Sequence, residues 1–225
     1  MLTKFLRAAT NAKNLVVSFI GSTIQTNSSN TTHTLTSASI GAANVNRRVV
    51  VTVGTVGTSG SDTVNTVTVG GVSLTKHIEV SGAVGVAIFS EVITTGTTAT
   101  IVVTTSASSN IAVRVFNVVG APSVYNAGSS ASNTTTSIIS SPNLTVGYLD
   151  VGVYAVSQQS TNSLTIAVSV GTSSFSSNTT FTANTSRRTG AGRITYDTSS
   201  STATVTLTGD ASTLKNLALA TFTPA

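Results

Sequence analysis

The sequence predicts an all-β fold, an antiparallel β-sandwich made of two pseudo-repeated halves and preceded by a short N-terminal helical arm. Three observations lead to this prediction. Short alternating apolar runs recur between turns rich in Gly, Ser, Asn and Thr, as in sandwiches and barrels. The strand formers Thr and Val are abundant. The segments Thr97–Pro122 and Ser201–Ala225 share one plan: a Thr-Ala-Thr triplet, an alternating run, a polar loop, and a second run that ends at Phe116 or Phe222 shortly before a proline.

Eight runs predict strands in the first half. They are Leu15–Ile20, Thr32–Ser37, Arg48–Val53, Val64–Val69, Val72–Lys76, Val84–Ile93, Ala99–Thr105 and Ile111–Val119. The Gly70-Gly71 pair predicts a two-residue hairpin turn, because both glycines can take a positive φ. The short Thr-Thr-Gly connection before Ala99–Thr105 predicts a second hairpin, with Val84–Ile93 as its other strand.

The second half follows the same plan. Its predicted strands are Thr135–Ile139, Tyr148–Val156, Leu164–Val170, Gly192–Thr198, Ala203–Leu207 and Leu217–Phe222. The halves span residues 15–120 and 121–225. A half with one apolar face is barely stable alone, so we expect residues 15–225 to form one sandwich whose halves face each other. The alternative is two small domains joined by a linker at Ala121–Thr136.

The N-terminal residues 1–14 differ in composition from the rest of the chain. Lys4, Arg7 and Lys13 interrupt their apolar positions. We expect a short helical arm with Phe5 and Leu6 on one side.

The composition limits the classes of function. Only 8% of the residues are charged, against about 25% in an average domain. Ser, Thr, Asn and Gly must therefore cover the surface, and such short side chains lose little entropy when copies pack together. The chain has no cysteine, which excludes disulfides and thiolate sites. The net charge of +5 is spread without a basic stripe, so we expect no nucleic-acid partner. No apolar run approaches the roughly 20 residues of a membrane helix.

Catalytic motifs are not recognisable, and we expect no enzyme, metal or cofactor. His33 and His77 lie outside any motif and are interpreted as solvated surface residues. The acids are Asp62, Glu79, Glu91, Asp150, Asp197 and Asp210. The pairs Glu79/Glu91 and Asp150/Asp197 could approach each other as in glycosidases. We favour ion pairs with Arg114, Arg188 or Arg193 instead.

Two arginine pairs, Arg47-Arg48 and Arg187-Arg188, allow two interpretations. Their charge can deter stray pairing at a strand edge, or it can dock onto an acidic or phosphorylated neighbour. Together with arm residues they form the set of candidate assembly contacts: Lys4, Phe5, Leu6, Arg7, Arg47, Arg48, Arg187 and Arg188.

The stretch Thr63–Gly120 resembles a recurrent pattern in structural proteins of tailed bacteriophages. It carries a Val-Thr-Val-Gly-Gly hairpin, then a Thr-Gly-Thr-Thr-Ala-Thr-Ile-Val-Val-Thr run, then a strand that ends in Val-Gly. The closing Ala-Thr-Phe-Thr-Pro-Ala also resembles the ends of such proteins. The resemblance covers Val49–Gly120 well and the second half loosely.

This resemblance implies a β-sandwich or jelly-roll component of the virion without catalytic residues. We expect a capsid decoration protein whose partners are its own copies, for example in a trimer, and the major capsid protein. A tail or fibre component is the nearest alternative. The others are a glycan-binding or glycan-cleaving sandwich and a coat protein with Met1–Asn14 as a basic inner arm. The scarcity of aromatic residues argues mildly against sugar binding.

Overall fold

The computed structural model describes twelve stretches of the chain. They are residues 14–25, 30–57, 62–120, 122–130, 138–141, 143–147, 149–160, 165–169, 172–181, 187–196, 201–210 and 213–225. Every helix or strand element in these stretches is a β-strand, and all strand pairs are antiparallel, which confirms the all-β prediction. The helical arm is not supported. Residues 1–13 lie outside the described stretches, and Asn14 is exposed and has no helical structure.

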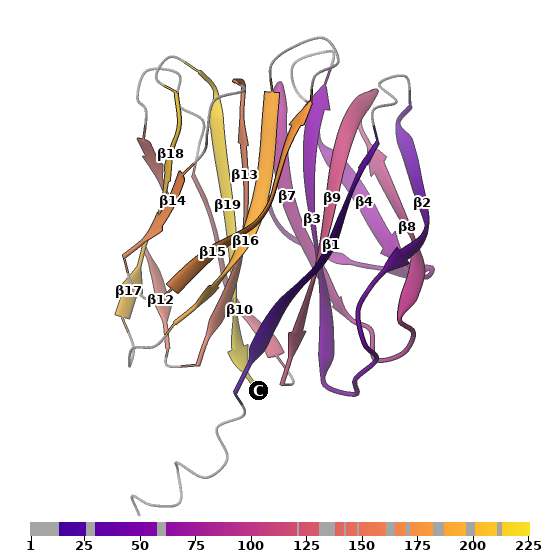
Figure 1. Cartoon of the computed structure of the whole chain (residues 1–225), viewed down its shortest axis with the longest axis vertical. Helices are drawn as coiled ribbons and strands as arrows, with labels where there is room; N and C mark the ends of the chain where they lie inside the picture. The colour runs from indigo at the N-terminus through magenta and orange to yellow at the C-terminus, as the bar shows by residue number, and fades with distance from the viewer. Residues whose placement is uncertain are drawn as a thin grey trace, which may run out of the picture.

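The first half forms two sheets (Figure 1). The five-stranded sheet has the order β1-β9-β3-β7-β6, and the four-stranded sheet has the order β2-β8-β4-β5. The strands are β1 (Val16–Gln25), β2 (Thr32–Ser39), β3 (Arg47–Gly57), β4 (Val64–Val69), β5 (Val72–Ser73), β6 (Thr75–Val80), β7 (Val84–Val92), β8 (Thr98–Thr105) and β9 (Ser109–Val119).

The second half repeats the five-stranded sheet with the order β10-β19-β13-β16-β15, beside sheets of order β11-β18-β14 and β12-β17. Its strands are β10 (Pro122–Ser130), β11 (Ile138–Ser140), β12 (Leu144–Val146), β13 (Val151–Gln158), β14 (Thr165–Val168), β15 (Thr172–Phe181), β16 (Arg187–Thr195), β17 (Ser201–Ala203), β18 (Val205–Thr208) and β19 (Lys215–Pro224).

Strand pairing within each half is nested. In the first half β1 pairs with β9, β2 with β8, β3 with β7 and β4 with β5. In the second half β10 pairs with β19, β11 with β18, β12 with β17 and β13 with β16. Each half is thus a long antiparallel hairpin that has folded over on itself, so the ends of the half lie side by side.

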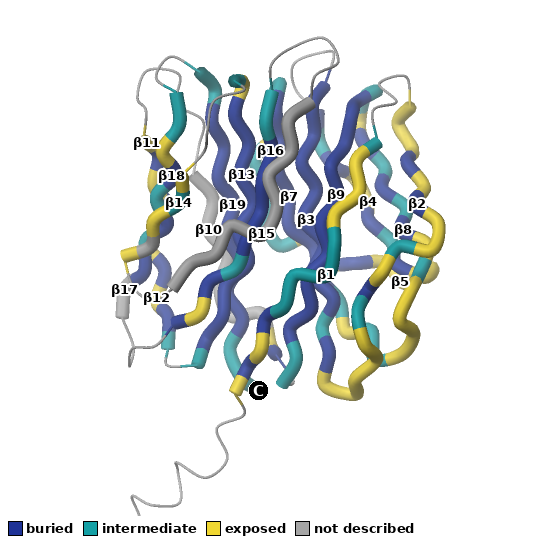
Figure 2. The backbone as a smooth tube through the Cα atoms, viewed as in Figure 1, coloured by how far each residue is buried: buried dark blue, intermediate teal, exposed yellow. Residues whose placement is uncertain are grey.

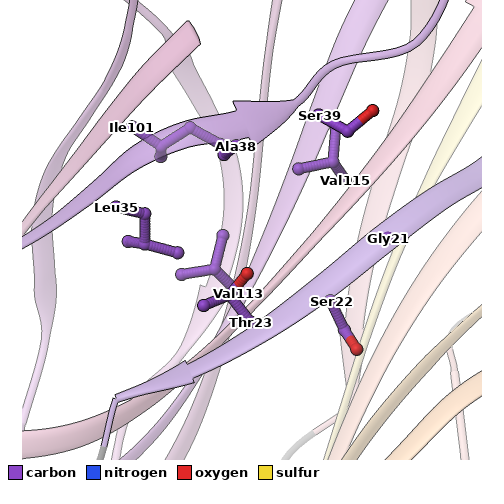
Figure 3. Close-up of a pocket in the computed structure, with 9 residues that line it drawn as sticks. All are labelled: Gly21, Ser22, Thr23, Leu35, Ala38, Ser39, Ile101, Val113 and Val115. Atoms are coloured by element: carbon purple, nitrogen blue, oxygen red, sulfur yellow. The ribbon is translucent and has the colours of Figure 1, made fainter. Parts of the chain in front are cut away.

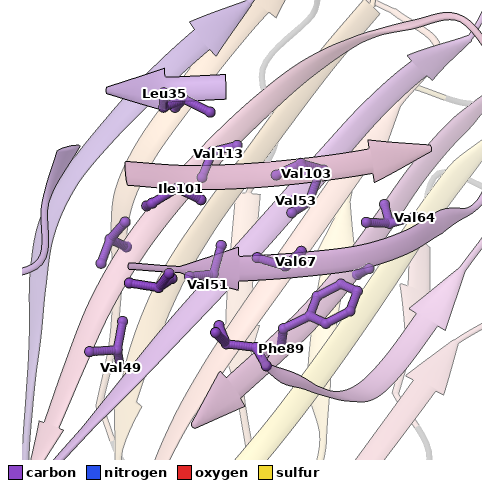
Figure 4. Close-up of a cluster of buried hydrophobic side chains, with 14 of the residues drawn as sticks. Leu35, Val49, Val51, Val53, Val64, Val67, Phe89, Ile101, Val103 and Val113 are labelled. Atoms are coloured by element: carbon purple, nitrogen blue, oxygen red, sulfur yellow. The ribbon is translucent and has the colours of Figure 1, made fainter. Parts of the chain in front are cut away.

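Among the described residues, the three largest apolar clusters lie between the sheets. The first lies between the two sheets of the first half and includes Val51, Val67 and Phe89 (Figure 4). Another lies inside the second half, around Tyr154 and Leu207. We expected each half to contribute one sheet to a shared core, but each contributes more than one sheet and encloses apolar residues of its own.

The third layer lies between the two five-stranded sheets, and we call it the seam. The first half supplies large side chains there, including Val50, Ile88 and Phe116. The second half supplies four alanines, Ala155, Ala191, Ala218 and Ala220, together with Val151, Val153 and Phe222. Large side chains facing small ones allow two sheets to approach closely. The buried centre of the molecule in Figure 2 includes this layer.

The two hairpin predictions had opposite outcomes. Gly70 and Gly71 have φ values of 58° and 83° and join paired strands, as predicted. The second hairpin prediction is wrong, because β7 and β8 belong to different sheets. The Thr94–Gly96 connection instead crosses from the five-stranded sheet to the four-stranded one.

Candidate functional site

The four candidate contacts in the arm, Lys4, Phe5, Leu6 and Arg7, lie outside the described residues. The two arginine pairs are described. They lie on β3, the central strand of its sheet, and on β16, which has neighbours on both sides. Protection of a strand edge is therefore not their role.

Arg47 is fully buried and binds backbone carbonyls. Its Nε and Nη2 donate to the carbonyls of Ile93 and Thr95, both at 2.6 Å. Its Nη1 is within 2.8–3.2 Å of four carbonyl oxygens, those of Ile40, Gly41, Ala42 and Gly96. Burial lowers the pKa of Arg47. A side chain with no exposed surface offers nothing to a partner. Arg47 instead connects two loops through its hydrogen bonds, one at Ile40–Ala42 and the other at Ile93–Gly96.

Three other arginines connect the two halves across the seam. Arg48 donates to the carbonyl of Pro122 at 3.3 Å and to Ser90 Oγ at 3.2 Å. Arg187 donates to the carbonyls of Gly57 and Ala83, each at 2.8 Å. Arg193 donates to the carbonyl of Val17 at 2.9 Å. Arg188 is half-buried on the same strand as Arg187 and Arg193.

Arg114 crosses the same seam from β9. It is fully buried and donates from Nη2 to the carbonyl of Thr189 at 2.7 Å and to its hydroxyl at 3.1 Å. Burial lowers the pKa of Arg114 to about 10. Among the described residues, Arg114 forms none of the ion pairs that we expected, and its hydrogen bonds both go to Thr189. The hydrogen bonds described here for Arg48, Arg114, Arg187 and Arg193 thus go to backbone carbonyls and to hydroxyl groups.

The interpretation of His33 as a solvated residue is wrong. Its side chain is 1% exposed, and neither ring nitrogen has a hydrogen-bond partner. It points into the first half beside Leu35, because alternate residues of β2 face inward. Burial lowers the pKa of His33.

His77 is half-buried, and its Nε2 lies 2.7 Å from Ser90 Oγ. It occupies the irregular step where the register between β6 and β7 shifts. Burial lowers the pKa of His77, Arg48 lowers it further, and Glu91 opposes both. Ser90 is fully buried and also accepts from Arg48. A substrate therefore has no access to this serine–histidine pair.

Two of the described acids, Glu79 and Asp150, accept hydrogen bonds from backbone amides. Glu79 accepts from the backbone of Val64 at 2.5 Å and forms an ion pair with Lys76 at 2.6 Å. Asp150 accepts from the backbone of Gly147 at 2.7 Å, and Asp197 lies outside the described residues. Within the described stretches, no three His, Cys, Asp or Glu side chains gather as they would around a metal ion.

A pocket of about 140 Å³ opens between β1 and β2, at one edge of the first half (Figure 3). Leu35, Ile101, Val113 and Val115 form its apolar part. Its remaining lining comes from the two edge strands: Gly21, Ser22 and Thr23 from β1, and Ala38 and Ser39 from β2.

Irregular pairing of both edge strands accompanies this pocket. The register of β1 with β9 shifts between Phe19 and Gly21, and that of β2 with β8 shifts between Leu35 and Ala38. Ser37, inside the second shift, has a φ of 53°. Such bulges bend a strand and redirect its side chains. The sequence analysis missed this pocket, although a glycine inside an alternating run, here Gly21, is a known sign of a bulge.

The outer face of the four-stranded sheet is covered with hydroxyl groups, and we call it the hydroxyl face. Register places Thr32, Thr104 and Thr66 in one row across β2, β8 and β4. Thr34 and Thr68 flank Val102 in the next row. The strands β2, β4, β5 and β8 contain no Asp, Glu, Lys or Arg.

No protein-family model matches this chain, and no curated protein matches it. In the stretches that the structure describes, no helix has the length and apolar character required to cross a bilayer.

Proposed function

We propose that this chain is a non-enzymatic structural protein of a viral particle, which decorates the capsid by packing against shell subunits and against copies of itself. The nested pairing in both halves is the observation that carries the proposal. Such pairing is typical of jelly rolls, which occur in viral capsid and lectin domains. The resemblance of Thr63–Gly120 to tailed-phage structural proteins favours the virion over other uses of this architecture.

The finer description of the fold belongs to the same proposal. We interpret the first half as one jelly-roll sandwich, with β1-β9-β3-β7 facing β2-β8-β4-β5. The second half has the corresponding order β10-β19-β13-β16. The seam would then join two sandwiches through their larger sheets.

The chemistry of the described residues also favours a packing role. Arg47 and Arg114 bind carbonyls inside the molecule, and the hydroxyl face presents short, uncharged side chains. Thr has few rotamers to lose on contact, because it is branched at Cβ. Such a face can pack against a repeating protein lattice with a small entropy cost.

Immunogold electron microscopy of purified virions that encode this chain tests the proposal. Label over the capsid supports a decoration role. Label confined to the tail or fibres would replace decoration with the tail alternative, and unlabelled particles, with the chain missing from their protein content, would contradict a virion role. A reproducible hit of the full chain on a glycan array would favour a receptor-binding module instead.

A further inference from the structure

We propose that the pocket between β1 and β2 receives the Phe5 side chain of a second copy of this chain. This inference rests on the proposed function, since it names the surface by which an assembly protein would join its copies. The occupant is the segment of residues 1–13, which the structure leaves undescribed.

The size of the pocket fits a phenyl ring. An apolar cavity of about 150 Å³ binds benzene in other proteins, and this pocket measures about 140 Å³. Its inner lining is aliphatic, from Leu35, Ile101, Val113 and Val115. Moving an aromatic side chain from water into such a pocket is favourable. Phe5 is the one aromatic residue among residues 1–13.

The backbone around the pocket suits an added extended segment. Both β1 and β2 are terminal strands of their sheets, so each has one side without a strand partner among the described residues. An extended peptide can add to such an edge through main-chain hydrogen bonds, while a pocket beside the edge selects one of its side chains. Exposed Ile24 on β1 adds apolar surface next to the pocket.

Geometry favours a segment from another copy over the same chain. To reach Gly21 from its own β1, the segment would have to turn at Asn14 and run back along the outer edge of that strand. The start of this edge is already occupied, since Arg193 of β16 donates to the carbonyl of Val17. A segment of another copy can approach Gly21–Thr23 directly, and about 9 residues between Phe5 and Asn14 span roughly 30 Å when extended.

Charge is consistent with apolar recognition. No lining residue is charged, so Lys4 and Arg7 would remain in water while Phe5 enters the pocket. Binding of this kind changes little with ionic strength, whereas docking of the basic arm onto an acidic surface weakens as salt rises.

Cysteine cross-linking of full-length chains tests the proposal, because the chain has no native cysteine. We would mix a Leu6→Cys chain with a differently tagged Ser39→Cys chain and oxidise the mixture gently. Ser39 lines the pocket, and its side chain is exposed. The expected product is a disulfide-linked heterodimer, in equal yield at low and high salt. The matched control replaces Ser39→Cys with Ser73→Cys, an exposed residue on the opposite edge strand β5, and should give at least tenfold less heterodimer.

Two further variants assign the contact to the ring and the pocket. Phe5→Ala in the Leu6→Cys chain should reduce the heterodimer at least tenfold, whereas Leu2→Ala should not. Gly21→Leu in the Ser39→Cys chain should reduce it similarly, because its side chain occupies the lining of the pocket. A Cβ at Gly21 meets no atom within 4 Å, and a melting curve checks that this variant folds. Phe5→Ala and Gly21→Leu act on different copies, so a folding defect in one copy cannot explain both losses.

Three results would overturn the inference: equal cross-linking at Ser39 and Ser73, insensitivity to Phe5→Ala, or an intramolecular disulfide alone when both cysteines are in one chain. The proposed function fails separately, if virions lack the chain while the heterodimer still forms. Labelled capsids without a heterodimer would leave decoration standing and reject the arm–pocket contact.

Discussion

Two arginines show how this protein buries cationic side chains although it has few acidic residues. Arg47 and Arg114 are fully buried, and the hydrogen bonds described for them go to backbone carbonyls and one hydroxyl. A buried guanidinium is costly unless its donors are satisfied. The planar fork of arginine can serve several carbonyls at once, which an ammonium group cannot match.

Arg47→Lys should lower the free energy of unfolding by about 2–4 kcal/mol, because lysine has fewer donors and a different geometry for the carbonyls around Thr95 and Ala42. Urea unfolding followed by circular dichroism measures this. Arg48→Lys is the matched control, with an expected loss of about 1 kcal/mol or less, since Arg48 is half-buried and its two hydrogen bonds are long. Equal losses of stability for the two variants would contradict the role of Arg47 in connecting the two loops.

His33 gives the protein a pH dependence with a definite sign. Burial lowers its pKa in the folded state below the ordinary 6.5. The unfolded chain therefore takes up the proton first, so stability is complete above about pH 6.5 and falls as the pH drops below it. The shift in His77 has the same direction.

The urea midpoint of the wild-type chain should fall between about pH 7 and pH 5, a range above the ordinary pKa of carboxylates. His33→Leu should remove much of this fall, because leucine fills the site without a titratable group. His77→Gln serves as the comparison and should keep the contribution of His33. A wild-type midpoint that is flat across this range would contradict the buried, neutral His33.

Charge alone could not place these residues from the sequence. An arginine at a strand start is usually exposed, and nothing local to Arg47 shows that loops near Ile40 and Thr95 will surround it. His33, in contrast, lies two residues before Leu35, and this alternation predicts that both side chains face the core. The prediction of a solvated His33 was based on the absence of a motif around it, and it was wrong.

At the scale of elements, strand positions were predictable but their partners were less so. Alternation identified runs such as Arg48–Val53, because one face of a half-buried strand must be apolar, and β3 includes that run. The turn at Gly70-Gly71 was predictable from local backbone requirements. The Thr94–Gly96 connection was not, because a short glycine-containing loop can close a hairpin or cross between sheets. The difference lies in contacts far away in the sequence, such as those of Arg47.

The seam depends on close approach of two strands at Gly54. A Cβ at this position would lie 2.8 Å from the Cβ of Thr189 on the opposite sheet. Gly54→Ala should therefore force β3 and β16 apart and lower the free energy of unfolding by about 1–3 kcal/mol. Differential scanning calorimetry measures the change. Gly21→Ala is the control, because its Cβ meets no atom within 4 Å, and a loss equal to that of Gly54→Ala would argue against crowding at the seam.

At the scale of the whole molecule, the seam couples the two halves. It combines a continuous apolar layer with hydrogen bonds from Arg48, Arg114, Arg187 and Arg193. Neither half can lose this layer without exposing apolar surface of the other. The pseudo-repeat was visible in the sequence, but the number of sheets per half was not, since alternation marks a buried face without indicating which sheet covers it.

Unfolding should therefore be a single transition. The chain has no tryptophan, and its four tyrosines, Tyr125, Tyr148, Tyr154 and Tyr196, are all in the second half. Tyrosine fluorescence therefore reports on that half, while circular dichroism reports on both. The two urea curves should coincide, as expected of two-state unfolding.

Phe116→Ala tests this coupling from the first half. Phe116 belongs to the seam. Its truncation should lower the free energy of unfolding measured by tyrosine fluorescence by about 3–5 kcal/mol, although no tyrosine is in that half. Separate transitions for the two probes, or an unmoved tyrosine curve in this variant, would show that the halves unfold independently.

The hydroxyl face has a consequence for the surroundings in which the molecule can work. Ions in solution weaken contacts between charged groups over distances of about a Debye length, but the strands β2, β4, β5 and β8 offer them no charged side chain. A contact made through this face would therefore keep its strength as the salt concentration rises.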